Sequence, residues 1–114
     1  METNATFVVD LRRRVPDLEP IYREHLADND ELLPHVFMGD VTRFTIAQAK
    51  APLNDSIVVS LLECLEEGLR EGGEEVKELI VVSFVENLIG ETTTLASLGP
   101  RIGGNLKEEV ERVC

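Results

Sequence analysis

The stretch EEVKELIVVSFVENLIGE, residues 74–91, decides whether this chain is helical or contains a β-sheet. Its centre, LIVVSFV, is rich in β-branched residues and apolar on nearly every side, which would also suit a buried strand. The stretch nevertheless runs for 18 residues without a turn signal, begins with glutamates and ends beside Gly90. A typical strand has about five or six residues, and glutamates suit a helix N-terminus, so we expect a central helix here.

Two further helices are predicted near the N-terminus. Apolar residues recur at helical spacing in residues 4–15, with Asn4 or Thr6 as the N-cap. A second helix begins at Asp17 and fades near Asn29.

The stretch ELLPHVFMGDVTRF, residues 31–44, contains two helix breakers within an amphipathic pattern. Pro34 and Gly39 predict a short helical turn followed by a separate helix from Asp40 to Lys50. The stretch suits an interhelical corner that fills the core. Alternatively, it presents three polar side chains to a ligand or partner, namely His35, Asp40 and Arg43.

Helices are also predicted on both sides of the decisive stretch. A leucine-rich stripe starts after Asn54, Asp55 or Ser56 as the N-cap and stops at Gly72 and Gly73. The last helix, NLKEEVERV, is capped by Asn105, and TTTLASLGPRIGG before it is a loop or a short broken helix.

These elements predict an all-α fold. A chain of 114 residues suits one domain, residues 1–114, and we expect a bundle or a short HEAT-like stack of five to six helices. The central helix is apolar all round, so either this chain or a second copy in a homodimer covers it.

Negative charge is concentrated in one part of the chain. Residues 55–91 hold ten acidic and two basic residues, and the whole chain has a formal net charge of −11. Seven glutamates close to the turn at Gly72 and Gly73 form the predicted partner-binding surface: Glu63, Glu66, Glu67, Glu71, Glu74, Glu75 and Glu78.

Two explanations of this charge remain open. Glutamates in a first helical turn complement the helix dipole, and Glu66 can pair with Arg70, so the charge could serve solubility alone. Glu67 and Glu71 repel each other near the negative end of their helix, where folding would favour lysine. That arrangement favours a surface that attracts a basic partner.

Direct binding of nucleic acid is not expected from this composition. A phosphate backbone is bound by clustered lysine and arginine, and the cluster present here is Arg12, Arg13 and Arg14. We expect these three arginines to complement the C-terminus of the first helix.

Catalytic and metal-binding patterns are weak. His25 and His35, with Glu24, Glu31 or Asp40 as further ligands, match no recognised metal spacing. Cys64 and Cys114 show no CxxC spacing, and we expect Cys64 to be a half-buried small hydrophobic residue. We therefore expect a non-enzymatic protein without a cofactor or metal.

No stretch reaches the roughly 18 apolar residues that would span a membrane, and no secretory signal precedes the first helix. We expect no membrane association and a cytoplasmic location.

The stretches ELLPHVFMGD and VSFVENL carry a resemblance to known sequences. Over most of its length the chain resembles a group of small, uncharacterised bacterial helical proteins that contain similar stretches. More loosely, its size, acidity and single helical domain are similar to immunity proteins of bacterial polymorphic toxin systems. Neither resemblance implies a catalytic residue.

The sequence therefore favours an acidic interaction protein, most concretely an immunity protein that binds and neutralises a basic toxin domain. One alternative is a regulatory or adaptor domain that binds a partner helix in an apolar groove. Another is a metal-dependent enzyme that uses His25 and His35.

Overall fold

One long helix occupies the centre of the fold. It consists of α5 (Glu74–Ile80), a π-helical segment (Val81–Val85) and α6 (Glu86–Leu88), which follow one another without a break. Its buried residues are Val76, Leu79, Ile80, Ser83, Phe84, Val85 and Leu88. The predicted central helix is confirmed, although one turn of it is π-helical.

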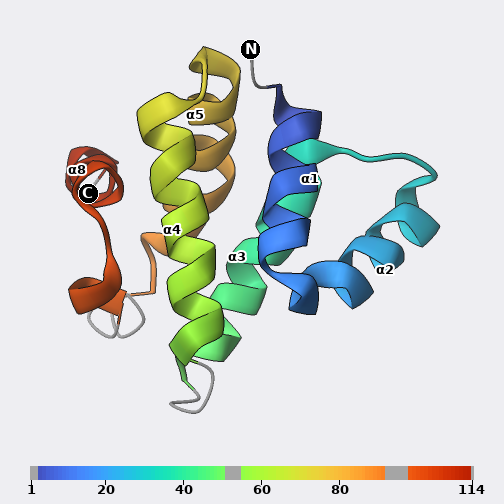
Figure 1. Cartoon of the computed structure of the whole chain (residues 1–114), viewed down its shortest axis with the longest axis horizontal. Coiled ribbons are helices and arrows are strands. Elements are labelled where there is room, and N and C mark those ends of the chain that lie inside the picture. The colour runs from blue at the N-terminus through green and yellow to red at the C-terminus, as the bar shows by residue number, and fades with distance from the viewer. Residues whose placement is uncertain (1–2, 51–54, 92–97, 114) are drawn as a thin grey trace.

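Most of the other helices pack against this central helix (Figure 1). The computed structural model describes residues 3–50, 55–91 and 98–113. The other helices are α1 (Asn4–Arg14), α2 (Glu19–Asn29), α3 (Pro34–Ala49), α4 (Asp55–Glu71) and α8 (Gly104–Val113). α4 lies beside α5 and is flanked by α1 on one side and α8 on the other, while α3 packs on the π-helical segment. α2 lies at the outer edge and packs against α3.

Apolar side chains from α1, α3, α4, α8 and the central helix make up most of one core cluster. Phe7, Phe37 and Phe84 are its largest members and come from α1, α3 and the π-helical segment. The Cα radius of gyration is 13.1 Å, close to the roughly 13 Å of a folded domain of this length. The predicted all-α, single-domain bundle is confirmed. The chain's own helices bury most of the central helix, which leaves Val82 exposed.

α3 differs from the sequence prediction because it is one continuous helix. Pro34 occupies the first turn, where a missing N–H costs nothing, and the Leu33 carbonyl accepts a hydrogen bond from the Phe37 N–H at 2.9 Å. Gly39 is accepted within the helix because Phe37, Met38 and Val41 are buried on either side of it. Burial of these residues outweighs the roughly 1 kcal/mol that an interior glycine costs.

Helix caps were predicted less accurately than helices. The N-cap of α1 is Thr3, neither Asn4 nor Thr6, and Thr6 completes a capping box with it. For α4, Asn54 lies outside the described residues, and Asp55 already belongs to the helix. Residues 92–97 of the predicted loop and Cys114 also lie outside the described residues, and Gly99–Arg101 forms a 3₁₀ turn.

The predicted helix stop at Gly72 and Gly73 is confirmed, and it depends on close packing. A Cβ at Gly72 would lie 2.5 Å from the Gly68 carbonyl oxygen and 2.9 Å from Val76 Cβ. No glycine in the described residues has a positive φ, so space rather than backbone conformation selects glycine here.

Gly72→Ala is therefore expected to lower the free energy of unfolding by about 1–3 kcal/mol, the usual cost of overpacking. Gly90→Ala is the matched control, because a Cβ at Gly90 would meet nothing within 4 Å. Urea denaturation of both variants measures the difference. Equal stability of the two variants would contradict the close-packing explanation.

Candidate functional site

The seven predicted partner-binding glutamates belong to α4 and α5, and the fold divides them into internal and exposed groups. Glu63, Glu67 and Glu71 follow one another four residues apart along one face of α4, which we call the α4 acidic stripe. Glu63 and Glu71 are exposed, and the Glu67 side chain is 44% exposed. The stripe keeps three like charges on one helix face.

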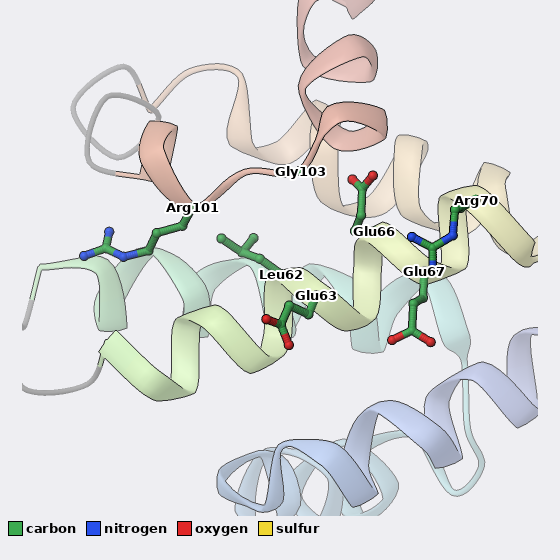
Figure 2. Close-up of a pocket in the computed structure, with 7 residues that line it drawn as sticks. All are labelled: Leu62, Glu63, Glu66, Glu67, Arg70, Arg101 and Gly103. Carbon is green, nitrogen blue, oxygen red and sulfur yellow. The ribbon is translucent and has the colours of Figure 1, made fainter.

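Glu66 has an internal role at the start of α8. Its carboxylate accepts hydrogen bonds from the Asn105 N–H at 2.9 Å, the Asn105 side-chain amide at 2.7 Å and the Leu106 N–H at 2.9 Å. Figure 2 shows Glu66 directed toward the chain at Gly103, whereas Glu63 and Glu67 point away from it. Asn105, predicted as the cap of the last helix, is instead a donor to the carboxylate that caps it.

The surroundings of Glu66 favour its charged form. Burial raises the pKa of the Glu66 carboxyl, but the hydrogen bonds from Leu106 and Asn105, helped by nearby Arg70, lower it below its ordinary value. Gly103 allows the close approach, because a Cβ there would lie 2.6 Å from Glu66 Cδ. A negative charge at a helix N-terminus is also favoured by the helix dipole.

Glu75 and Glu67 hold the two ends of α1. Glu75 Oε2 accepts a hydrogen bond of 2.6 Å from the Asn4 N–H in the first turn of α1. Glu67 Oε2 lies 2.7 Å from Arg14 Nη2 in the last turn, and this hydrogen bond raises the pKa of the Arg14 guanidinium. Arg12, Arg13 and Arg14 lie in the last turn of α1, where they were predicted to complement the helix C-terminus. They also form ion pairs within the fold, which was not predicted.

The remaining glutamates have only weak surface partners or none within the described residues. Glu71 lies 3.6 Å from Arg70 and Glu74 lies 3.9 Å from Lys77, with Glu74 97% exposed. Exposed pairs of this kind contribute little to stability. Glu74 and Glu78 line a groove between α5 and α8, separate from the α4 acidic stripe. The seven glutamates therefore do not form one continuous surface.

The two histidines are not brought together. His25 is buried, and its Nε2 accepts a hydrogen bond of 2.9 Å from the Leu33 N–H, so this nitrogen is not free to bind a metal. His35 Nδ1 lies 2.6 Å from Ser83 Oγ. Among the described residues, no group of three or more histidine, cysteine or acidic side chains is arranged to hold a metal.

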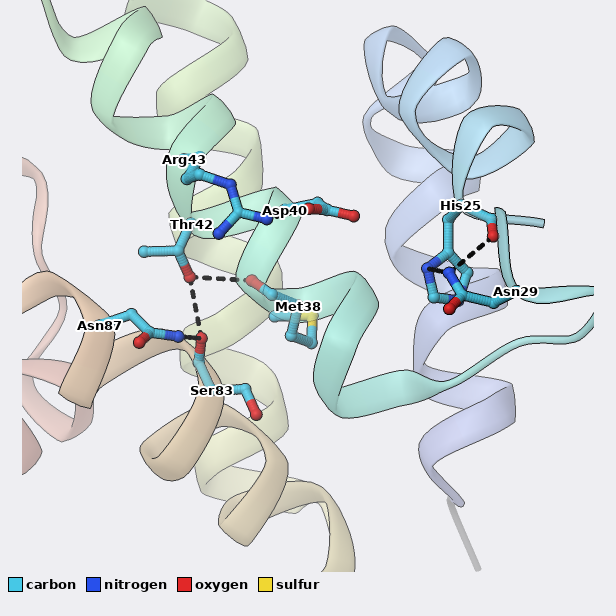
Figure 3. A network of polar contacts seen from close by, with 8 residues as sticks. All are labelled: His25, Asn29, Met38, Asp40, Thr42, Arg43, Ser83 and Asn87. Atoms are coloured by element: carbon cyan, nitrogen blue, oxygen red, sulfur yellow. Dashed lines mark hydrogen bonds and ion pairs between the residues drawn. The ribbon is translucent and has the colours of Figure 1, made fainter. Parts of the chain in front are cut away.

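A polar cluster around Ser83 was not predicted, because Ser83 lies inside an apolar run. Its carbonyl oxygen is 3.0 Å from Thr42 Oγ1 and accepts a 2.8 Å hydrogen bond from Asn87 Nδ2 (Figure 3). Nothing in the sequence marks the π-helical turn at Ser83 or the contact between Ser83 and His35, so only the structure reveals this cluster. Ser83 is only 4% exposed, so the contact with His35 joins α3 to the central helix rather than presenting a nucleophile.

Other predicted polar residues also interact locally. Asp40 pairs with Arg43 one turn later in α3. Cys64 is 1% exposed, more buried than predicted, because the α1–α4 contact covers it. None of the helices that the structure describes combines the length and the apolar composition that a membrane span requires.

The role of Glu66 predicts a specific pH dependence. A carboxyl whose pKa is lowered by folding stabilises the fold above its unfolded pKa of about 4.3, and this stabilisation is lost as pH falls through the lower folded pKa. Glu66→Gln is expected to lower the free energy of unfolding by about 1–2 kcal/mol at neutral pH, with the difference disappearing in acid. Denaturation at several pH values, with exposed Glu63→Gln as control, measures this. An unchanged pH dependence would contradict the capping role.

The contact between Glu66 and the start of α8 can also be tested at two adjacent glycines, Gly103 and Gly104. Gly103→Ala is expected to displace the Glu66 carboxylate and speed amide hydrogen exchange at Asn105 and Leu106. Gly104→Ala should leave exchange unchanged, because a Cβ there meets nothing within 4 Å. Equal exchange in both variants would show that α8 does not depend on this contact.

Comparison with known proteins identifies the family of the chain. No curated protein matches it, and no solved structure matches it. A family model described as "Domain of unknown function (DUF7674)" matches residues 8–113, nearly the whole chain. The chain therefore belongs to this uncharacterised family, Domain of unknown function (DUF7674).

Proposed function

We propose that the chain is a non-enzymatic binding module that docks a basic protein on the α4 acidic stripe. The most concrete form of this proposal is a bacterial immunity protein that binds and neutralises a toxin domain in the cytoplasm. Its support is that two exposed carboxylates of this stripe, Glu63 and Glu71, carry like charges that the fold itself does not require. The immunity role rests in addition on the looser resemblance of the chain to immunity proteins in size, acidity and helical fold.

The main support for the proposal is the electrostatic repulsion within the stripe, which destabilises α4. Glu63, Glu67 and Glu71 stand at i, i+4 and i+8, where like charges destabilise a helix by about 0.2–0.5 kcal/mol per pair. Glu71 is the last residue of α4, where the helix dipole favours a cation. Glu67 gains the Arg14 ion pair, but Glu63 and Glu71 have no comparable contact among the described residues. A partner that brings positive charge would turn this repulsion into attraction.

The chemistry of the partner follows from the same charges. A chain of net charge −11 repels phosphate backbones, so the partner is a protein with clustered lysine or arginine rather than a nucleic acid. Charge complementarity mainly raises the association rate, which suits a protein that must intercept its target quickly.

The double variant Glu63→Gln/Glu71→Gln tests this proposal and leaves the Glu67–Arg14 ion pair in place. In a pull-down at low salt, this variant is expected to lose the basic partner that the unaltered chain retains. Its association rate with that partner should fall about tenfold. For the immunity role, the retained partner should also stop growth of cells that lack the chain, and the variant should protect such cells poorly.

The matched control is Glu31→Gln/Glu91→Gln, which removes the same charge from two exposed positions outside α4. The control should retain the partner. If both variants lose it equally, or both keep it, the stripe is not the docking surface and its charge serves solubility. A captured partner without toxicity would leave a binding module and remove the immunity role.

A further inference from the structure

A second candidate binding site lies between α2 and α3. The groove there has a volume of about 550 Å³, and we call it the α2–α3 groove. Its apolar lining is Ile21, Val36 and Phe44, its acidic lining is Glu24, Asp28 and Asp40, and Arg43 adds one positive charge. Val36 is 48% exposed, which makes it one of the few large apolar side chains open to solvent among the described residues.

The walls of this groove are held in place although α2 lies at the edge of the fold. Arg12 donates two hydrogen bonds to Glu19, at 2.7 and 3.0 Å, and its guanidinium carbon lies 3.5 Å from the centre of the Tyr22 ring. His25 accepts the Leu33 N–H, which fixes the end of α2 to the connection before α3. A preformed groove spares a partner the entropy cost of ordering it.

The charges of the groove define the occupant. Glu24 and Asp28 stand four residues apart on α2, and Asp40 faces the groove from α3. Arg43 already places its guanidinium on the Asp40 carboxylate, so the chain itself displays the contact that a partner's arginine would make. Apolar residues between carboxylates suit lysine or arginine side chains, whose stems are apolar and whose ends are charged.

We propose that the α2–α3 groove docks a basic amphipathic helix of a partner protein. The apolar face of that helix packs on Ile21, Val36 and Phe44, and its lysine or arginine residues reach Glu24 and Asp28. A groove with apolar lining is the usual receptor for the apolar face of such a helix. This site is distinct from the α4 acidic stripe, so it does not depend on the function proposed above.

The proposal is tested by titrating the full chain into a fluorescein-labelled leucine–lysine amphipathic peptide of about 15 residues, a length at which isolated helices begin to form. Fluorescence anisotropy at physiological salt measures the Kd. Val36→Ser and Glu24→Gln/Asp28→Asn are each expected to weaken binding by about tenfold. Circular dichroism checks that the variants remain helical.

The chain supplies matched controls in the α5–α8 groove. Val82 is 42% exposed and lies there with Glu74 and Glu78, which are also four residues apart on a helix. Val82→Ser and Glu74→Gln/Glu78→Gln should leave the Kd unchanged. Equal weakening by both charge variants, with no effect of Val36→Ser, would show general attraction to an acidic chain and overturn the groove site.

Two other outcomes also overturn the groove site. One is a peptide that does not bind at all. The other is weakening by Glu63→Gln/Glu71→Gln alone, which would place the peptide on the α4 acidic stripe and leave the proposed function standing.

Discussion

Burial of the central helix is the constraint on which the other contacts depend. α5, the π-helical segment and α6 present apolar residues in several directions, so α1, α3, α4 and α8 must each pack on a different side. Polar groups caught inside this packing have to find partners, because an unpaired buried group costs about 1–3 kcal/mol. The Ser83 carbonyl meets this requirement through Thr42 and Asn87, which ties α3 to the central helix.

The acidic residues of α4 and α5 have two different roles. Glu66 and Glu75 accept hydrogen bonds from the N-terminal turns of α8 and α1, where four backbone N–H groups lack partners within their own helix. Glu67 binds Arg14 at the opposite end of α1. The α4–α5 pair therefore acts as a frame whose carboxylates hold its neighbours. Only the carboxylates left over, above all Glu63 and Glu71, are available for a role outside the fold.

Much of the fold could be predicted from the sequence, since a long apolar run without turn signals is a local property. Pro34 misled the prediction because a proline that breaks a helix and one that begins a helix look the same in sequence. The site was harder. Glu63 and Glu66 are both polar positions of one amphipathic helix, and only the position of α8 shows that Glu66 is internal. The His35–Ser83 contact likewise joins residues 48 positions apart.

The π-helical segment also bears on how the central helix would respond to a change in chain length. A π turn closes its hydrogen bond over one residue more than an α turn, as the Glu86 N–H does with the Val81 carbonyl. The extra residue is absorbed locally, so the buried faces of α5 and α6 remain aligned with the same neighbours. A relative that lacks one residue between Val81 and Val85 would regain a plain α-helix without rotating either flank. Deletion of one residue elsewhere in this helix would instead rotate one flank and misalign its buried contacts.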